Sequence, residues 1–190
     1  VYFHNHFTDP FYDDVITNTN GDPMLFTKDY PRVIPTSFFR MRFFHGNVPK
    51  FGEIAECKYE DKKFCLFVSK NNLNENKTKC ASALLKIGDV DFIMQKQFDY
   101  LVSKPCLHGV DLIKAFSKYK FIICFENSNT PGYITEKIFN VFLAKSIPIY
   151  DGAQNIGSFV NPKAFIAFDE RCIQKIRMLN ASKELYERVI

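Results

Sequence analysis

Residues whose types suit chemistry gather in the segment between residues 125 and 138. Asn127 follows an apolar run, and Tyr133, Glu136 and Lys137 lie where an amphipathic helix is expected to begin. Backbone N–H groups at a helix start carry a partial positive charge that favours an anion. A lysine in the first turn opposes the helix dipole, so Lys137 is easiest to explain if its ammonium faces a diphosphate.

Glu136 suits the same place, because the helix dipole favours a carboxylate in the first turn and because its oxygens can accept a hydrogen bond from a sugar hydroxyl. The alternative is that Glu136 and Lys137 are ordinary solvated residues that follow a turn. Spacing alone does not separate these two interpretations, and both stay open at this point.

The elements that must position these residues alternate between strands and helices from residue 63 onward. Short apolar runs predict strands, and apolar residues that recur at helical spacing predict helices. Strands are predicted over residues 63–69, 90–94, 120–126, 146–150 and 164–168, and helices over residues 80–87, 111–119, 133–145 and 169–190.

This alternation predicts βαβ units around a parallel sheet, which is an α/β fold. Parallel sheets bind ligands beyond the carboxyl ends of their strands, so the loops after Ser69, Glu126 and Tyr150 are the expected places for a site. Residues 1–60 keep no clear apolar period and are broken by prolines, so they form an irregular first part.

Composition excludes several classes of protein. Apolar residues make up 46% and charged residues 24% of the 190 residues, which indicates a globular chain. No apolar run is long enough for a membrane span. The net charge of +4 fits a phosphorylated ligand, but no basic run accompanies it, so no nucleic-acid partner is expected. Because the chain opens on Val1 without an initiator Met, we expect a piece of a longer protein.

The cysteines do not show the spacing of a structural zinc site, because the sequence has no CxxC and no paired Cys/His pattern. We therefore predict no metal site. Cys65 and Cys124 lie inside apolar runs and are expected to be buried free thiols, with pairing in an oxidising compartment as the alternative.

Three ordered blocks resemble the signature of the α-1,3-fucosyltransferases, glycosyltransferase family 10. They are FIICFENS at 121–128, GYITEKI at 132–138 and IPIYDG at 147–152, and NPKAFI at 161–166 continues the similarity. The resemblance implies the two-domain GT-B fold. Residues 61–190 would be the Rossmann-like domain that binds GDP-fucose, and residues 1–60 would be the remnant of the acceptor-binding domain.

By position, the resemblance places Asn127, Tyr133, Glu136 and Lys137 in the donor site. Lys137 would neutralise the diphosphate leaving group, and Glu136 would hold the fucose ring near the developing oxocarbenium charge. Asn127 and Tyr133 would contact donor hydroxyls or phosphate oxygens. The implied reaction is an inverting transfer of fucose to a glycan hydroxyl, typically α-1,3 to N-acetylglucosamine.

The resemblance also bears on cofactors and location. GDP-fucose is a substrate, and the chemistry is expected to need no cofactor and no metal because protein cations stabilise the leaving group. Family members are associated with membranes, in the Golgi lumen or on the cytoplasmic face in bacteria. We therefore expect membrane association through segments that this chain does not contain.

Two departures from the family pattern matter. The family has an Arg after its first donor-domain strand, and the nearest position here is Lys77, which offers a point charge without a planar fork and is otherwise a solvated loop lysine. The family's general base is a Glu in a Gly-Glu-Asn motif, which this sequence lacks. A loose alignment puts His4 near that place, and an imidazole can act as a base near neutral pH, unless His4 is simply a surface residue.

Three functions stay open on the sequence. The first is an inverting fucosyltransferase. The second is a homologue that binds a GDP-sugar without catalysis, for which the missing Gly-Glu-Asn motif is the marker. The third is a GT-B transferase that uses another GDP-sugar.

Overall fold

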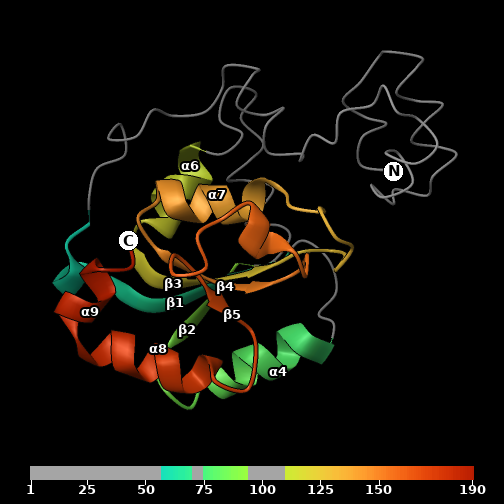
Figure 1. Cartoon of the computed structure of the whole chain (residues 1–190). Helices are drawn as coiled ribbons and strands as arrows, with labels where there is room; N and C mark the ends of the chain where they lie inside the picture. The colour runs from blue at the N-terminus through green and yellow to red at the C-terminus, as the bar shows by residue number, and fades with distance from the viewer. Residues whose placement is uncertain (1–56, 70–74, 94–109) are drawn as a thin grey trace, which may run out of the picture.

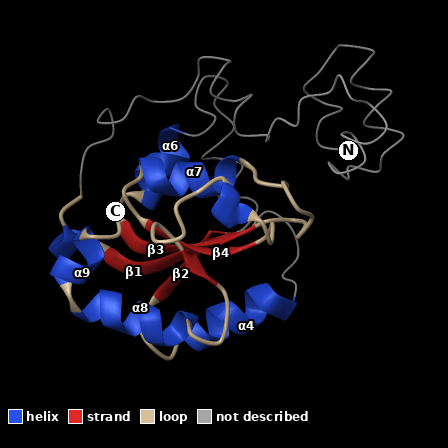
Figure 2. Cartoon of the chain, in the orientation of Figure 1, coloured by secondary structure: helices blue, strands red, loops and turns tan. Residues whose placement is uncertain are grey.

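The computed structural model describes residues 57–69, 75–93 and 110–190. These residues form three layers, in which a parallel sheet lies between helices on both faces (Figure 1, Figure 2). The predicted α/β fold is confirmed for this part of the chain. The predicted acceptor-domain remnant over residues 1–60 lies almost wholly outside the described residues, so it and the boundary at residue 61 stay predictions.

The sheet has five strands in the order β2-β1-β3-β4-β5, and every neighbouring pair is parallel. Continuous apolar runs form the inner strands because both of their faces are covered. The strands are β1 (Lys63–Val68), β2 (Val90–Ile93), β3 (Tyr119–Phe125), β4 (Ile147–Asp151) and β5 (Ile166–Ala167).

Two groups of helices cover the sheet. The first group is α6 (Val110–Phe116) and α7 (Glu136–Leu143), which lie on one face (Figure 1). The second group, on the other face, is α4 (Glu75–Leu84), α8 (Cys172–Ala181) and α9 (Lys183–Glu187). Two short 3₁₀ turns complete the described elements, η1 (Tyr59–Asp61) and η2 (Ile156–Ser158).

Strand β3 shows how the sheet divides the core. Side chains alternate across a strand, so Ile122 and Cys124 join the cluster under α6 and α7, while Phe121 and Ile123 join the cluster under α4 and α8. Cys65 and Cys124 are buried and free, which confirms the prediction made for these two thiols.

Several element ends differ from the prediction. The helix predicted over 133–145 begins at Glu136, and the terminal helix predicted over 169–190 is broken at Ser182. The helix predicted over 111–119 ends at Phe116, because Tyr119 begins β3. Helix α4 begins at Glu75, five residues before the predicted start at residue 80.

Lys62 lies at the amino ends of the strands, opposite to the ends at which a parallel sheet binds ligands. Its ammonium donates hydrogen bonds to the carbonyl oxygens of Ser117 (2.9 Å) and Lys145 (2.8 Å). The side chain is buried, and desolvation lowers the pKa of Lys62 to about 8. This lysine ties the start of β1 to the segments that precede β3 and β4.

No helix among the described residues is both long enough and apolar enough to cross a membrane.

Candidate functional site

Helices α4 and α7 both begin at the carboxyl ends of β3 and β4, which we call the carboxyl edge of the sheet. The backbone N–H of Glu126 donates to the carbonyl of Asp151 (2.7 Å), which joins the two strand ends. The Asn76 side chain donates to the Asp151 carboxylate (3.0 Å), which fastens the first turn of α4 to the same place. Helix α7 begins at this edge too, because the loop that precedes it leaves the end of β3. The predicted location of the site, beyond the ends of parallel strands, therefore has the expected arrangement.

Lys137 is held at this edge by three oxygen atoms. Its ammonium lies 3.1 Å from the carbonyl oxygen of Phe125, 3.3 Å from Asn127 Oδ1 and 3.2 Å from Glu126 Oε2. One third of the Lys137 side chain (33%) is exposed, so the residue is fixed by the protein and is still in contact with solvent. The structure thus brings together Asn127 and Lys137, two residues that the sequence placed in one site.

Glu126 is the residue at this edge that the sequence argument missed. Its side chain is completely buried (0% exposed), and it accepts a hydrogen bond from the Thr135 N–H (2.8 Å). Thr135 Oγ1 lies 2.9 and 2.8 Å from the two carboxylate oxygens, so its hydroxyl also donates to Glu126. One signal for Glu126 was available in the sequence: it is an acidic residue directly after an apolar strand. Such a residue has to be paired if the strand end is buried.

Lys77 lies on α4, and the sequence left open whether it is a donor-site lysine or a solvated loop lysine. Its side chain is only 8% exposed. The pKa of Lys77 is lowered, first by burial and then by repulsion from the Lys137 ammonium. Asn76, the neighbour of Lys77, is hydrogen-bonded to Asp151, so lysines from two different helices stand near helix starts at the same ends of β3 and β4, where an anion is favoured.

Tyr133 and Glu136 lie on the segment that leads into α7. Both are half-buried, and Glu136 is the first residue of the helix, as the dipole argument expected. Gly132 has a φ of 80°, a left-handed conformation that favours glycine, and its N–H donates to Asn155 Oδ1 (2.7 Å). The Tyr133 N–H donates to the Thr130 carbonyl (3.0 Å), so this segment is fixed by its own turns and by the loop after β4.

The remaining candidates are not placed by the structure. His4 lies outside the described residues, so its suggested role as a base stays a prediction. Within the described ranges, no three His, Cys, Asp or Glu side chains come together as metal ligands would.

Residues 57–189 match the family model described as Glycosyltransferase family 10 (fucosyltransferase) C-term. This chain belongs to glycosyltransferase family 10. The family 10 resemblance that the motifs indicated is therefore confirmed, and the Rossmann-like edge described above lies within the matched residues.

Named relatives are similar in sequence to parts of this chain. The Alpha-(1,3)-fucosyltransferase FucT of Helicobacter pylori is 41% identical over 76 residues, which cover 37% of this chain and 16% of the relative. The 4-galactosyl-N-acetylglucosaminide 3-alpha-L-fucosyltransferase 9 of Bos taurus is 30% identical over 119 residues, which cover 62% of this chain and 32% of the relative. The chain therefore spans a third or less of the length of these relatives.

A solved structure shows the same fold. The crystal structure of an α1,3-fucosyltransferase with GDP-fucose superimposes with a TM-score of 0.58 at 26% identity, covering 70% of this chain and 39% of that chain. The same enzyme type without a named ligand gives a TM-score of 0.58 at 27% identity, covering 70% of this chain and 38% of that chain. The family 10 domain described here has the α/β fold of one part of these GT-B enzymes.

Proposed function

We propose that this family 10 member transfers fucose from GDP-fucose to a hydroxyl of a glycan, with inversion and with an α-1,3 linkage to N-acetylglucosamine. The observation that carries the proposal is the pair of lysines, Lys77 and Lys137, at one carboxyl edge of a parallel sheet. Two cations beside two helix starts match the charge of a nucleoside diphosphate. A structural neighbour that contains GDP-fucose supports the choice of donor.

In this proposal the two lysines act on the leaving group. When the bond between fucose and the diphosphate breaks, negative charge grows on the phosphate oxygens, and fixed ammonium groups stabilise it. Lys137 is held against Phe125 and Asn127, so little reorganisation is needed at that moment. We assign Glu136 to the fucose ring, where its carboxylate would stabilise the developing positive charge, and Asn127 and Tyr133 to donor contacts.

We further propose that the transfer needs no metal, because the two lysines and the helix starts supply positive charge where the diphosphate would lie. An acceptor hydroxyl still has to lose its proton, so a general base is required. His4 is the candidate base within this chain. We also propose, from the family resemblance, that the protein associates with a membrane and that its acceptor is a glycan.

A second function is favoured by one observation, which is the absence of a Gly-Glu-Asn motif from the 190 residues. A domain with a complete donor edge and no base would bind a GDP-sugar without transferring it. The two functions share the donor site and differ in turnover, so one set of measurements separates them.

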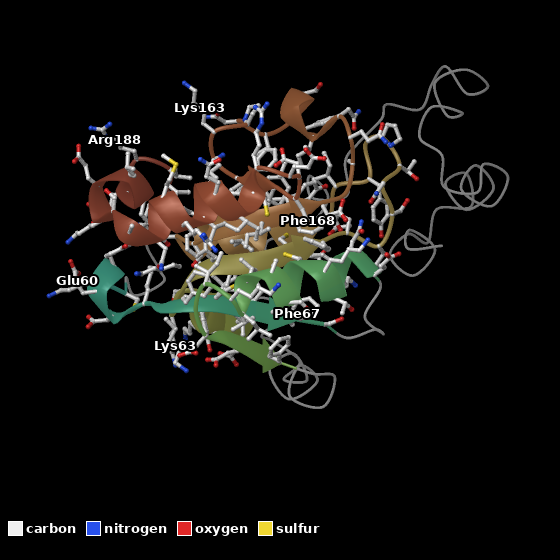
Figure 3. The ribbon with its side chains drawn as sticks, turned by 90° about the horizontal axis from the view of Figure 1, so that it is seen from below. Glu60, Lys63, Phe67, Lys163, Phe168 and Arg188 are labelled. Carbon is white, nitrogen blue, oxygen red and sulfur yellow. The ribbon has the colours of Figure 1, made fainter. Side chains whose placement is uncertain are left out.

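The test is calorimetric titration of the full chain with GDP, followed by a transfer assay with GDP-fucose, GDP-mannose and a panel of lactosamine acceptors. We expect GDP binding, and we expect Lys137→Ala to raise the Kd for GDP about ten- to a hundredfold, since a hydrogen bond to a charged group contributes about 1.5–3 kcal/mol. The matched control is Lys163→Ala, because Lys163 is exposed at the periphery (Figure 3).

Each outcome decides between the candidates. Fucose transfer supports the enzyme, and transfer from GDP-mannose instead of GDP-fucose identifies a different donor. GDP binding without transfer to any acceptor supports the binding domain. A chain that binds no GDP, or a Lys137→Ala variant that binds GDP as tightly as the Lys163→Ala control, contradicts the proposed site.

A further inference from the structure

The buried carboxylate of Glu126 lies directly behind the exposed ammonium of Lys137, at 3.2 Å. We propose that Glu126 is a positioning residue of the donor site, which fixes both Lys137 and the start of α7 without touching the donor. That the ligand is GDP rests on the proposed function. The positioning role of Glu126 goes beyond that function. Three observations lead to the assignment.

The first observation is that the Glu126 carboxylate makes its contacts with the start of α7. It accepts from the Thr135 N–H (2.8 Å) and from the Thr135 hydroxyl, and it pairs with the Lys137 ammonium. A buried carboxylate is stable only if it is fully paired, so all these groups are held in one arrangement. Glu136 lies between Thr135 and Lys137 in the chain, and its backbone is fixed by the same contacts.

The second observation is the space that the end of β4 leaves for Glu126. A Cβ atom on Gly152 would lie 2.7 Å from Glu126 Cγ and 2.5 Å from Tyr150 Oη, which is too close for either contact. The Tyr150 hydroxyl is itself fixed, because it accepts a hydrogen bond from the Ala153 N–H (3.1 Å). The Glu126 side chain therefore has one place to lie, between Gly152 and the start of α7.

The third observation concerns the two lysines. The pKa of Lys77 is lowered first by burial and then by the positive charge of Lys137, so the two ammonium groups repel each other. Without an anchor, the partly exposed Lys137 side chain can turn toward water and away from Lys77. The carboxylate of Glu126 supplies that anchor from the buried side, so the charge of the ammonium stays at the place proposed for a phosphate group.

Positioning and simple charge predict opposite results, which makes the inference testable. A carboxylate that acted only through its charge would repel a diphosphate, so Glu126→Gln would tighten GDP binding. A carboxylate that positions Lys137 has the reverse effect. We expect Glu126→Gln to raise the Kd for GDP about tenfold, a size typical of coupling between contacting residues. Tighter or unchanged binding overturns the inference.

Two further variants complete the design. Glu126→Asp keeps the charge and shortens the reach, so positioning again predicts weaker GDP binding, and unchanged binding overturns it. This variant also keeps the test decisive if Glu126→Gln fails to fold. Glu60→Gln is the matched control, because Glu60 forms an exposed pair with Lys183 (2.7 Å), lies at the periphery (Figure 3) and changes the net charge equally.

A double-mutant cycle separates positioning from loss of fold. If Glu126 acts through Lys137, then Glu126→Gln combined with Lys137→Ala binds GDP within about twofold of Lys137→Ala alone, whereas additive losses overturn the inference. Calorimetric stoichiometry reports the folded fraction separately from the Kd. A wild-type chain that binds no GDP overturns the proposed function and this inference together. Normal wild-type binding with an unaffected Glu126→Gln overturns this inference alone.

Discussion

Buried charges are the most informative single residues of this domain. In the described part of the chain, the buried residues with charged side chains are Lys62, Lys77 and Glu126. Burying a charge is unfavourable unless it is paired, so such residues are rare without a structural or functional reason. Two of these three residues lie at the proposed donor edge, while Lys62 lies at the opposite edge of the sheet and is paired with backbone carbonyls.

The Gly152→Ala substitution tests the fit around Glu126 at the scale of one methyl group. The added Cβ would lie 2.5 Å from Tyr150 Oη, so one of the neighbours has to move. We expect a loss of about 1–3 kcal/mol in the free energy of unfolding, measured by urea denaturation.

Gly157 provides the control for that substitution. A Cβ there would meet only Pro162 Cγ, at the ordinary contact distance of 3.5 Å. Gly157→Ala should therefore leave the free energy of unfolding almost unchanged. Equal stability of the two variants would contradict the close fit described at Gly152.

The residues of the site differ in how far the sequence could predict them. Asn127 follows an apolar strand and Lys137 lies in the first turn of the next helix, so the topology of parallel sheets places both at the same end of the sheet. Lys77 was harder to place, because its burial depends on where α4 begins. Glu126 was missed because its partners, Thr135 and Lys137, are set by the path of the loop, and no local pattern encodes that path.

At the scale of elements, the start of α7 decides the geometry of the site. Thr135 is the N-cap, and its side chain accepts from the Lys137 N–H (3.4 Å) while its hydroxyl donates to Glu126. The helix therefore begins at Glu136, three residues after the predicted start at Tyr133. Residues 133–135 lie outside the helix, and Gly132 just before them donates a hydrogen bond to Asn155 in the loop after β4.

Substitution of Thr135 tests this cap. Thr135→Ala removes the cap and one donor to the buried carboxylate, so we expect a loss of about 1–2 kcal/mol in the free energy of unfolding and weaker GDP binding. Thr135→Ser keeps the hydroxyl and should stay within about 0.5 kcal/mol of the wild type. Urea denaturation and calorimetry measure the two effects.

The cap of α9 supplies the comparison. Ser182 accepts a hydrogen bond from the Leu185 N–H (3.3 Å) at a site distant in sequence from α7. Ser182→Ala should lower stability without changing the Kd for GDP. A change in GDP binding equal to that of Thr135→Ala would show that the cap of α7 has no special link to the site.

Element positions were predicted well, and element ends were not. Strands such as 120–126 are continuous apolar runs, and burial on both faces leaves few other ways to fold them. Helix ends depend on contacts with distant residues. Ser182 breaks the last helix because it caps α9. Gly88, just past the helix predicted over 80–87, lies where a Cβ would meet the Phe64 ring at 2.8 Å.

At the scale of the whole molecule, Lys62 links stability to pH. Its pKa is lowered from 10.5 to about 8 in the folded state, so the unfolded chain binds more protons between these values. The contribution of Lys62 to the free energy of unfolding therefore rises as the pH increases from about 8 to about 10.5, by roughly 3 kcal/mol at most.

Comparison with Lys62→Met isolates this effect. We expect the difference in unfolding free energy between wild type and Lys62→Met to grow in favour of the wild type across that pH range, measured by urea denaturation. The exposed Lys58 is the control, since Lys58→Met makes the same substitution without removing a buried charge. A constant difference for Lys62→Met would contradict the effect of burial on the Lys62 pKa.

The strand order has a consequence for biosynthesis. β3 lies in the middle of the sheet, where Cys65 of β1 is registered with Phe121 on one side and Phe121 with Ile147 of β4 on the other. A nascent chain that has emerged only through β2 holds two strands whose inner edge is unpaired and whose face toward α6 and α7 is uncovered. Folding of the domain therefore waits until residues 119–125 have left the ribosome, and before that moment the emerging segment is a natural substrate for chaperones.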